Sequence, residues 1–237
     1  MKNLIVANWK MNPTTQKEAK DIFDAIRDGS KGLNAEVVVC PPAVYLYASG
    51  FGEGIIAMGA QNVFYEDKGA FTGEISPAMF KDLGVEYVII GHSERRKLFG
   101  ETNEDINKKI KKSLEVGLKV IFCIGETAEE NIDARRDETL SRQIKQGLAG
   151  IDNLENVNIA YEPVWAIGTG NNCGFDEAKG AIEFIRENSR VARILYGGSV
   201  KSENSGEYIK NALANGLLVG GASLKPEEFI KIVKSAE

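Results

Sequence analysis

Short apolar runs rich in Val and Ile recur along the chain, and a longer segment with helical periodicity follows each of them. The runs are continuous rather than alternating, which is typical of parallel strands covered on both faces. They predict strands at Leu4–Ala7, Glu36–Val39, Ile55–Gly59, Tyr87–Ile90, Lys119–Ile124, Asn158–Tyr161, Arg193–Tyr196 and Leu217–Val219. The periodic segments predict helices at Thr15–Arg27, Val44–Gly50, Pro77–Leu83, Asn103–Val116, Asn131–Gly147, Asp176–Asn188, Asn204–Ala214 and Pro226–Lys234.

Eight strand–helix units in 237 residues correspond to about 30 residues per unit, which is the size of one βαβ repeat. No linker, Pro/Ser-rich stretch or charge run divides the units. This organisation predicts an α/β fold, a closed (β/α)8 barrel formed as a single domain over residues 1–237. An open doubly wound sheet is the alternative, because a count of units does not exclude it. In a barrel, the chemistry is expected in the loops that follow the strands, at one rim.

Composition limits the partners and the chemistry. The chain has 29 basic and 34 acidic residues, a net charge of −5, which argues against nucleic acid or an acidic membrane surface as the main partner. His92 is the only histidine, so a histidine-rich metal site is impossible. The three cysteines form no CxxC pair, which disfavours a disulfide framework or a zinc ribbon. The apolar run at the amino terminus is far too short for a signal peptide or a membrane span, so a cytoplasmic enzyme is expected.

Lys10 follows the first predicted strand and is flanked by Trp9 and Met11. Apolar neighbours would hold the lysine stem and aim the ammonium group inward, where it could bind an anion or stabilise an oxyanion. The alternative is a solvated surface amine, which is the usual state of a lysine.

The fourth predicted strand leads into Gly91-His92-Ser93. Gly91 permits a sharp turn, and Ser93 could cap a following helical turn. An imidazole beside a helix amino terminus is biased toward its neutral form, which can still donate one N–H to a carbonyl oxygen. The residues after Ser93 are either a solvated charge run or a support, in which Glu94 orients Lys10 and two arginines fix the loop by ion pairs.

After the sixth predicted strand, Pro163 fixes its own φ and favours extended geometry for Glu162, so this carboxylate would emerge at the mouth of the barrel. An apolar segment, residues 164–167, follows and leads to two glycines, Gly168 and Gly170. The segment fits a lid with hinges at its ends, and it fits an ordinary buried loop equally well.

Two glycine pairs end the last two predicted strands: Gly197-Gly198 and Gly220-Gly221. Either pair alone is a weak signal, because glycine pairs are common in turns. Together they match the place where barrels bind phosphate through backbone N–H groups. A protein with net negative charge can hold a dianion in this way.

Five extended segments jointly resemble the triosephosphate isomerase family. They are Ala7–Asn12, Gly91–Arg96, Tyr161–Gly170, Tyr196–Val200 and Val219–Leu224. They occur in the family's order and cover the chain from end to end. The resemblance implies a TIM barrel that interconverts dihydroxyacetone phosphate and D-glyceraldehyde 3-phosphate through an enediolate intermediate, in glycolysis and gluconeogenesis. It implies neither a cofactor nor a metal ion.

The resemblance also implies a role for each matched residue. Glu162 would be the base that takes the proton from the carbon next to the carbonyl, His92 the neutral electrophile, and Lys10 the group that stabilises the enediolate. Ser93 and Glu94 would support them. The substrate and its phosphate would bind Asn8, Lys10, Gly168, Ser199, Gly220 and Gly221. The lid would consist of Pro163, Val164, Trp165, Ala166, Ile167, Gly168 and Thr169.

Residues 59–74 form a long loop without a clear secondary-structure pattern, and such a loop in a compact domain is usually functional or disordered. In the family that the chain resembles, this loop reaches into a second subunit. The resemblance therefore implies a homodimer, with Thr72 at the interface.

Two other functions remain open at this point. The first is a Schiff-base aldolase that uses a lysine, for which Lys10 is poorly placed beyond the strand end. The second is a non-catalytic phosphate-binding or scaffold protein, which would not need Glu162, His92 and Lys10 together. The segment after the predicted lid, Asn171–Phe175, also departs from the family's usual helix start, which contains Thr and Pro.

Overall fold

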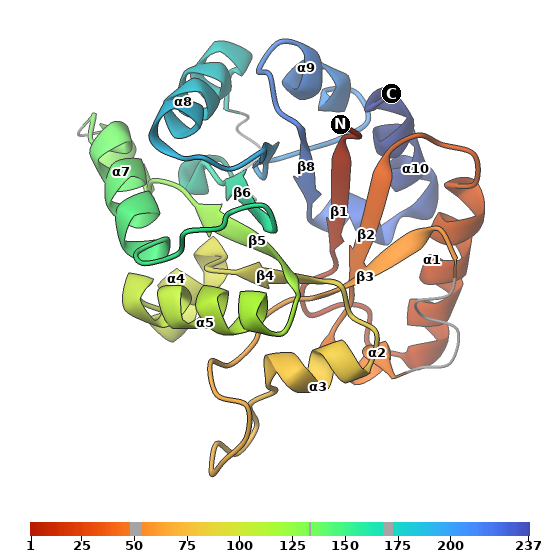
Figure 1. Cartoon of the computed structure of the whole chain (residues 1–237). Helices are drawn as coiled ribbons and strands as arrows, with labels where there is room; N and C mark the ends of the chain where they lie inside the picture. The colour runs from red at the N-terminus through yellow and green to blue at the C-terminus, as the bar shows by residue number, and fades with distance from the viewer. Residues whose placement is uncertain (48–53, 133, 168–172) are drawn as a thin grey trace.

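The computed structural model describes residues 1–47, 54–132, 134–167 and 173–237. In these residues, eight parallel strands pair in chain order, and the last pairs with the first to close a barrel (Figure 1). The strands are β1 (Leu4–Asn8), β2 (Glu36–Cys40), β3 (Ile56–Ala60), β4 (Tyr87–Ile90), β5 (Lys119–Ile124), β6 (Val157–Tyr161), β7 (Arg193–Tyr196) and β8 (Gly216–Val219). The predicted (β/α)8 barrel is confirmed, and the open doubly wound sheet is excluded.

The strands are apolar on both faces because each face meets a separate part of the core. Side chains alternate along a strand, so Leu4 and Val6 of β1 belong to one buried cluster and Ile5 and Ala7 to another. The first cluster is built from the strands alone, and the second also contains the inner faces of the helices. This double burial explains why the sequence shows continuous apolar runs rather than alternation.

Helices cover the outside of the barrel (Figure 1). In the described residues they are α1 (Gln16–Gly29), α2 (Ala43–Leu46), α3 (Pro77–Asp82), α4 (Ser93–Phe99), α5 (Asn103–Glu115), α6 (Ala128–Ile132), α7 (Arg136–Gly147), α8 (Phe175–Asn188), α9 (Ser205–Lys210) and α10 (Pro226–Ser235). The 3-10 turns η1 (Val164–Ala166) and η2 (Gly221–Leu224) follow β6 and β8. Side-chain caps set several starts: Thr15 accepts the N–H of Glu18 before α1, and Thr102 forms a capping box with Asp105 before α5.

Three helix predictions differ from the structure. The single helix predicted over Asn131–Gly147 is wrong, because the chain forms α6 and α7 and turns between them at Ala134, whose φ is 55°. The helix predicted to Ala214 ends at Lys210. Of the helix predicted at Val44–Gly50, the structure describes α2, and residues 48–50 lie outside the described residues.

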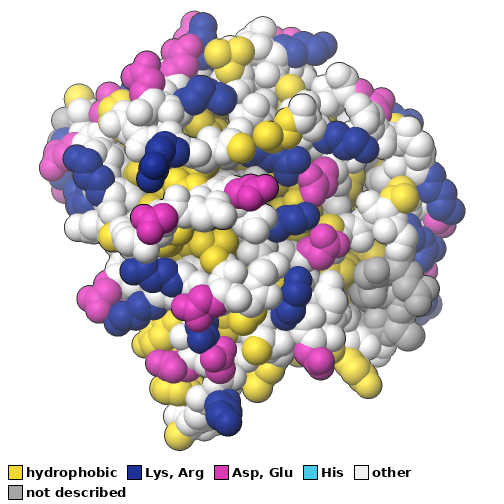
Figure 2. Space-filling view, viewed as in Figure 1, with side chains coloured by type: hydrophobic (Ala, Val, Ile, Leu, Met, Phe, Trp, Pro, Cys, Tyr) yellow, Lys and Arg dark blue, Asp and Glu magenta, His cyan; other side chains and the backbone are white. Residues whose placement is uncertain are grey.

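The segment between β3 and α3 projects from the body of the barrel (Figure 1). It folds back on itself, since the N–H of Phe64 donates to the carbonyl of Ile75 over 2.9 Å, and the rings of Phe64 and Phe71 lie 4.7 Å apart. On the face shown in Figure 2, acidic and basic side chains are interspersed. Among the described helices, none is both long enough and apolar enough to cross a membrane.

Candidate active site

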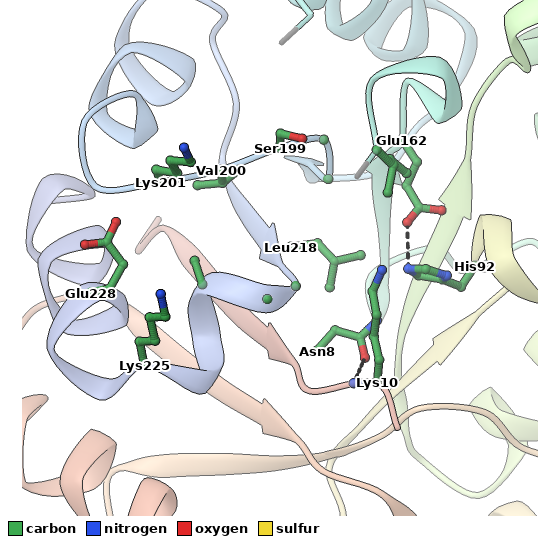
Figure 3. Close-up of a pocket in the computed structure, with 16 residues that line it drawn as sticks. Asn8, Lys10, His92, Glu162, Ser199, Val200, Lys201, Leu218, Lys225 and Glu228 are labelled. Atoms are coloured by element: carbon green, nitrogen blue, oxygen red, sulfur yellow. Dashed lines mark hydrogen bonds and ion pairs between the residues drawn. The ribbon is translucent and has the colours of Figure 1, made fainter. Parts of the chain in front are cut away.

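A cavity of about 550 Å³ opens where the strands end, and it contains the three residues singled out for carbonyl chemistry (Figure 3). Lys10 enters it after β1, His92 after β4 and Glu162 after β6. The glycine turns after β7 and β8 form another part of its wall. Residues that are far apart in the sequence therefore meet at one rim, because parallel strands in a barrel all end on the same side.

The backbone of Lys10 is held in an unfavourable conformation by its neighbours. Its φ is 54°, in the left-handed region that residues other than glycine rarely adopt. The N–H of Lys10 donates to Asn8 Oδ1 over 3.1 Å, and its carbonyl accepts from Gln61 Nε2 over 2.8 Å. Its Nζ lies 2.5 Å from Glu94 Oε1. Such strain at a fixed position is typical of functional sites, and here it directs the ammonium group into the cavity (Figure 3).

His92 is itself the N-cap of α4, so the expectation that Ser93 caps this helix is wrong. The His92 Nδ1 accepts the backbone N–H of Glu94 over 3.2 Å, and the residue has the extended geometry of a cap, with φ −52° and ψ 140°. Because Nδ1 acts as the acceptor, the proton of a neutral imidazole is on Nε2. That nitrogen lies 2.9 Å from Glu162 Oε1 (Figure 3).

Glu162 is a buried carboxylate, with 2% of the residue exposed. Its Oε2 accepts the backbone N–H of Ser93 over 2.9 Å, while its Oε1 faces His92. The turn after β7 packs closely against this side chain, since a Cβ at Gly197 would lie 3.1 Å from the Cγ of Glu162. Pro163 follows at once, and the chain turns away into η1.

Opposing effects act on the pKa values of this pair. Burial lowers the pKa of His92, but the charge and the hydrogen bond of Glu162 outweigh burial and raise it. Burial raises the pKa of Glu162, but His92 and the Ser93 N–H outweigh burial and lower it. A second proton on the imidazole would have to displace the Glu94 N–H from Nδ1. We expected the position beside a helix terminus to favour the neutral imidazole, and the contact with Glu162 acts in the opposite direction.

The first part of the predicted lid forms a turn directly after β6, and hydrogen bonds hold this turn against the barrel. The indole N–H of Trp165 donates to Glu126 Oε1 over 2.8 Å, and the hydroxyl of Ser199 donates to the carbonyl of Ala166 over 2.8 Å. Val164 and Ile167 complete this part of the segment. Gly168 and Thr169, also predicted for the lid, lie outside the described residues.

The other predicted substrate-binding residues line the same cavity. Ser199 follows β7, Gly220 and Gly221 follow β8, and Asn8 ends β1. The stem of Lys10 passes close to Gly220, at which a Cβ would lie 3.4 Å from Lys10 Cε. Of the predicted phosphate-binding positions, only Gly168 lies outside the described residues. In the described part of the chain, no three His, Cys, Asp or Glu side chains gather as a metal-ligand set.

Two further residues support the site by holding backbone carbonyls, and only Gln61 was not predicted from the sequence. Gln61 holds the carbonyls of both Lys10 and Cys40, each over 2.8 Å. Arg96 was expected to form an ion pair, but its partly buried guanidinium donates to the carbonyls of Gly91 and Cys123, at 2.8 Å and 3.1 Å. It thereby braces the turn that carries His92. Gln61 belongs to no spacing pattern that could have revealed it, and only the fold brings the carbonyl of Cys123 within reach of Arg96.

This arrangement can move a proton on a small anionic carbonyl compound. A buried carboxylate is a suitable base for a C–H next to a carbonyl. The imidazole N–H and the ammonium group can stabilise the negative charge that develops on the oxygen, and they do so most strongly in a site that excludes water. The glycine turns can hold an anionic group of the same molecule at the other side of the cavity.

Comparison with known proteins gives one family over nearly the full chain. The family model described as "Triosephosphate isomerase" matches residues 3–236. Among curated proteins, a triosephosphate isomerase of Dictyoglomus thermophilum is 47% identical over 248 residues, which cover 99% of this chain and 99% of that protein.

Proposed function

The chain belongs to the triosephosphate isomerase family, and we propose that it interconverts dihydroxyacetone phosphate and D-glyceraldehyde 3-phosphate through an enediolate intermediate. The reaction would serve glycolysis and gluconeogenesis, with residues 1–237 acting as a single catalytic domain. The observation that carries the proposal is the convergence of Glu162, His92 and Lys10 in one cavity with two glycine turns.

Glu162 is the base in this proposal. It removes the proton from the carbon next to the carbonyl, and it returns a proton to the neighbouring carbon to complete the isomerisation. Its burial and its two fixed contacts, with His92 and with the N–H of Ser93, keep the carboxylate in one place and in its ionised form. The contact of Oε2 with the N–H of Ser93 keeps the base in position when the substrate takes the place of Oε1 as the partner of His92.

His92 is the electrophile. When a substrate carbonyl replaces Glu162 Oε1 as the acceptor of the Nε2 proton, the hydrogen bond by which Glu162 raises the pKa of His92 is lost, while burial and the Lys10 ammonium still lower that pKa. The imidazole is then neutral and donates one hydrogen bond to the oxygen on which charge develops. The same N–H can pass its proton between the two oxygens of the enediolate.

Lys10 stabilises the enediolate, and the backbone N–H groups of Ser199, Gly220, Gly221 and Gly168 bind the phosphate. Asn8 Oδ1 supports Lys10 by accepting the backbone N–H of Lys10, and the Glu94 carboxylate supports it by pairing with the Lys10 ammonium group. The lid, residues 163–169, excludes water so that the enediolate does not lose its phosphate. The reaction needs no cofactor or metal ion, because the base and the electrophiles are side chains.

A coupled assay of isomerisation in both directions tests this function, and we expect rapid turnover by the purified chain. Borohydride trapping with a ketose phosphate tests the alternative of a Schiff-base aldolase and should label no lysine. The Nζ of Lys10 lies 2.5 Å from Glu94 Oε1, so this carboxylate occupies the nitrogen on which a Schiff base would have to form. Absence of isomerisation would reject the proposal.

We further propose that the chain is a homodimer, joined by the projecting loop that contains Thr72. Next to the active site lies a second cavity, of about 320 Å³, which shares Lys10 and His92 with it and is also lined by Met11 and Phe99. Met11 and Phe99 are large and exposed. A loop that projects from one protomer can fill this cavity in its partner, and the two-fold symmetry of a dimer repeats the contact.

Sedimentation velocity at micromolar concentration should therefore give a species of twice the 25.9 kDa chain mass. The variant Phe99→Glu should shift it toward the monomer, because it places a charge in the contact. Ile132→Glu is the matched control, since Ile132 is exposed on α6 and away from this cavity. A monomeric wild type, or equal behaviour of the two variants, would contradict the proposed interface.

A cytoplasmic location is proposed together with this function. Cys40, Cys123 and Cys173 are free and buried, as expected of a protein in a reducing compartment.

A further inference from the structure

Gln143 lies on the inner face of α7, and its amide group binds one residue of the backbone twice. Its Oε1 accepts the N–H of Gly125 over 2.8 Å, and its Nε2 donates to the carbonyl of Gly125 over 3.0 Å. Gln143 is 7% exposed, so water does not replace these bonds easily. Gly125 comes directly after β5, where regular pairing with β6 ends.

Gly125 is in close contact with the backbone of the catalytic base. A Cβ at Gly125 would lie 1.7 Å from the carbonyl oxygen of Glu162 and 2.6 Å from its carbonyl carbon. No side chain fits between these two segments, so any shift of Gly125 toward β6 must displace Glu162 itself. A shift in the other direction would leave the backbone of Glu162 without its support.

The neighbours of Gly125 extend this contact on both sides. The N–H of Glu162 donates to the carbonyl of Ile124 over 2.8 Å, and the N–H of Val164 donates to the carbonyl of Glu126 over 3.1 Å. Residues 124–126 therefore run beside residues 162–164 as an irregular continuation of the β5–β6 pairing. Gly125 is the middle residue of this stretch, and the amide of Gln143 binds both its N–H and its carbonyl.

The packing of α7 explains how a side chain of this length reaches the backbone. Gly147 lies one helical turn after Gln143, on the same face of α7. A Cβ at Gly147 would lie 2.3 Å from the ring of Phe122 in β5, so only glycine permits this close approach of the helix to the strand. The contact of Gly147 with Phe122 thus sets the spacing between α7 and the end of β5, and the side chain of Gln143 spans this spacing.

We propose that Gln143 is a positioning residue of the active site, which fixes the carboxylate of Glu162 through the backbone of Gly125. Gln143 neither lines the cavity nor contacts a reacting group, so it acts only through its two hydrogen bonds to Gly125. The kinetic test of this inference rests on the proposed function. The test that follows the contact between Glu162 and His92 depends on geometry alone.

The first test is Gln143→Leu, which preserves most of the side-chain volume and removes both hydrogen bonds. We expect kcat to fall between about tenfold and a hundredfold, because small displacements of a reacting group have effects of this size. KM should change little, since Lys10 and the glycine turns are untouched. Gln146→Leu is the matched control, because this neighbour on α7 loses only an exposed bond to Asn103, and it should keep wild-type kinetics.

The second readout does not depend on isomerase activity. His92 gives the only imidazole signal of the chain, and its pKa is raised by the nearby Glu162 carboxylate. In Gln143→Leu, a displaced carboxylate should lower that pKa, which nitrogen-edited NMR measures directly. If the wild type did not isomerise triose phosphates, the proposed function would fail, and this measurement would still decide the role of Gln143.

The variant Gln143→Glu covers the case in which Gln143→Leu does not fold. A protonated carboxyl group can accept from the Gly125 N–H and donate to its carbonyl, as the amide does, whereas a carboxylate repels the carbonyl. Burial raises the pKa of a carboxyl group above its usual value of about 4.3. The kcat of this variant relative to wild type should therefore fall as the pH rises from about 5.5 to 9.

If the ratio of the kcat of Gln143→Glu to that of the wild type did not change with pH, the proposal would be overturned. A folded Gln143→Leu variant with kcat within twofold of wild type and an unchanged His92 signal would also overturn it.

Discussion

In the variant Glu162→Gln, kcat for isomerisation should fall by a factor of about 10² to 10⁴, the usual contribution of a positioned general base. The amide has the size of the carboxyl group but cannot take a proton from carbon. KM should stay close to that of the wild type, because Lys10 and the glycine turns still bind the anionic substrate. Steady-state coupled assays in both directions measure the effect.

Glu162→Asp separates the position of the base from its chemistry. The shorter side chain keeps the carboxylate but withdraws it by about one ångström, and such a misplacement can reduce the rate by about 10². If Glu162→Gln retained more than a tenth of the wild-type kcat, another group would remove the proton; if Glu162→Asp did so, the rate would not depend on the exact position of the carboxylate.

The same glutamine variant provides a measurement on His92. Without the carboxylate, burial and the Lys10 ammonium remain, and both lower the pKa of His92. The imidazole should then stay neutral over more of the range from about pH 5 to 8 than it does in the wild type. An unchanged titration would mean that Glu162 does not control the charge of His92.

The variant Lys10→Met should reduce kcat/KM by about 10² to 10³, as expected when one donor to a developing oxyanion is lost. Methionine keeps the unbranched stem that passes Gly220 and removes the charge. Both kcat and KM should change, because the ammonium group attracts the anionic substrate and also stabilises the enediolate. Glu94 loses its partner, but its side chain is 43% exposed and can be solvated.

Lys231→Met is the control for this experiment, since it removes one positive charge from the exposed side of α10 and does not touch the cavity. It should leave kcat/KM unchanged. If Lys10→Met kept more than a fifth of the wild-type kcat/KM, Lys10 would be a surface amine that merely lies near the cavity.

The barrel and the main site residues could be predicted because each depends on a pattern that the chain repeats. Strands buried on both faces carry apolar residues at successive positions, and these short apolar runs marked all eight strands. Since parallel strands end at one rim, Lys10, His92 and Glu162 could be expected to meet before any distance was known. The resemblance to one family then suggested their roles.

The remaining features depend on contacts that no local pattern encodes. The break between α6 and α7 occurs at Ala134, in a stretch with no glycine or proline to mark it. His92 replaces the expected serine as the cap of α4, with Nδ1 accepting the N–H of Glu94 while Nε2 faces Glu162. Gln61, Arg96 and Gln143 bind backbone carbonyls of distant segments. The sequence offered Arg96 as a support of its loop but through ion pairs, and it gave no sign of the roles of Gln61 and Gln143.

The pairing of β1 with β8 has a consequence for synthesis on the ribosome. β8 begins at Gly216, more than 200 residues after β1 ends at Asn8, so its partner edge is absent while most of the chain is made. At common elongation rates this delay lasts roughly ten to forty seconds. During that time one edge of an apolar strand can pair with other nascent chains. Ring closure is thus also the step that protects the newborn protein from aggregation.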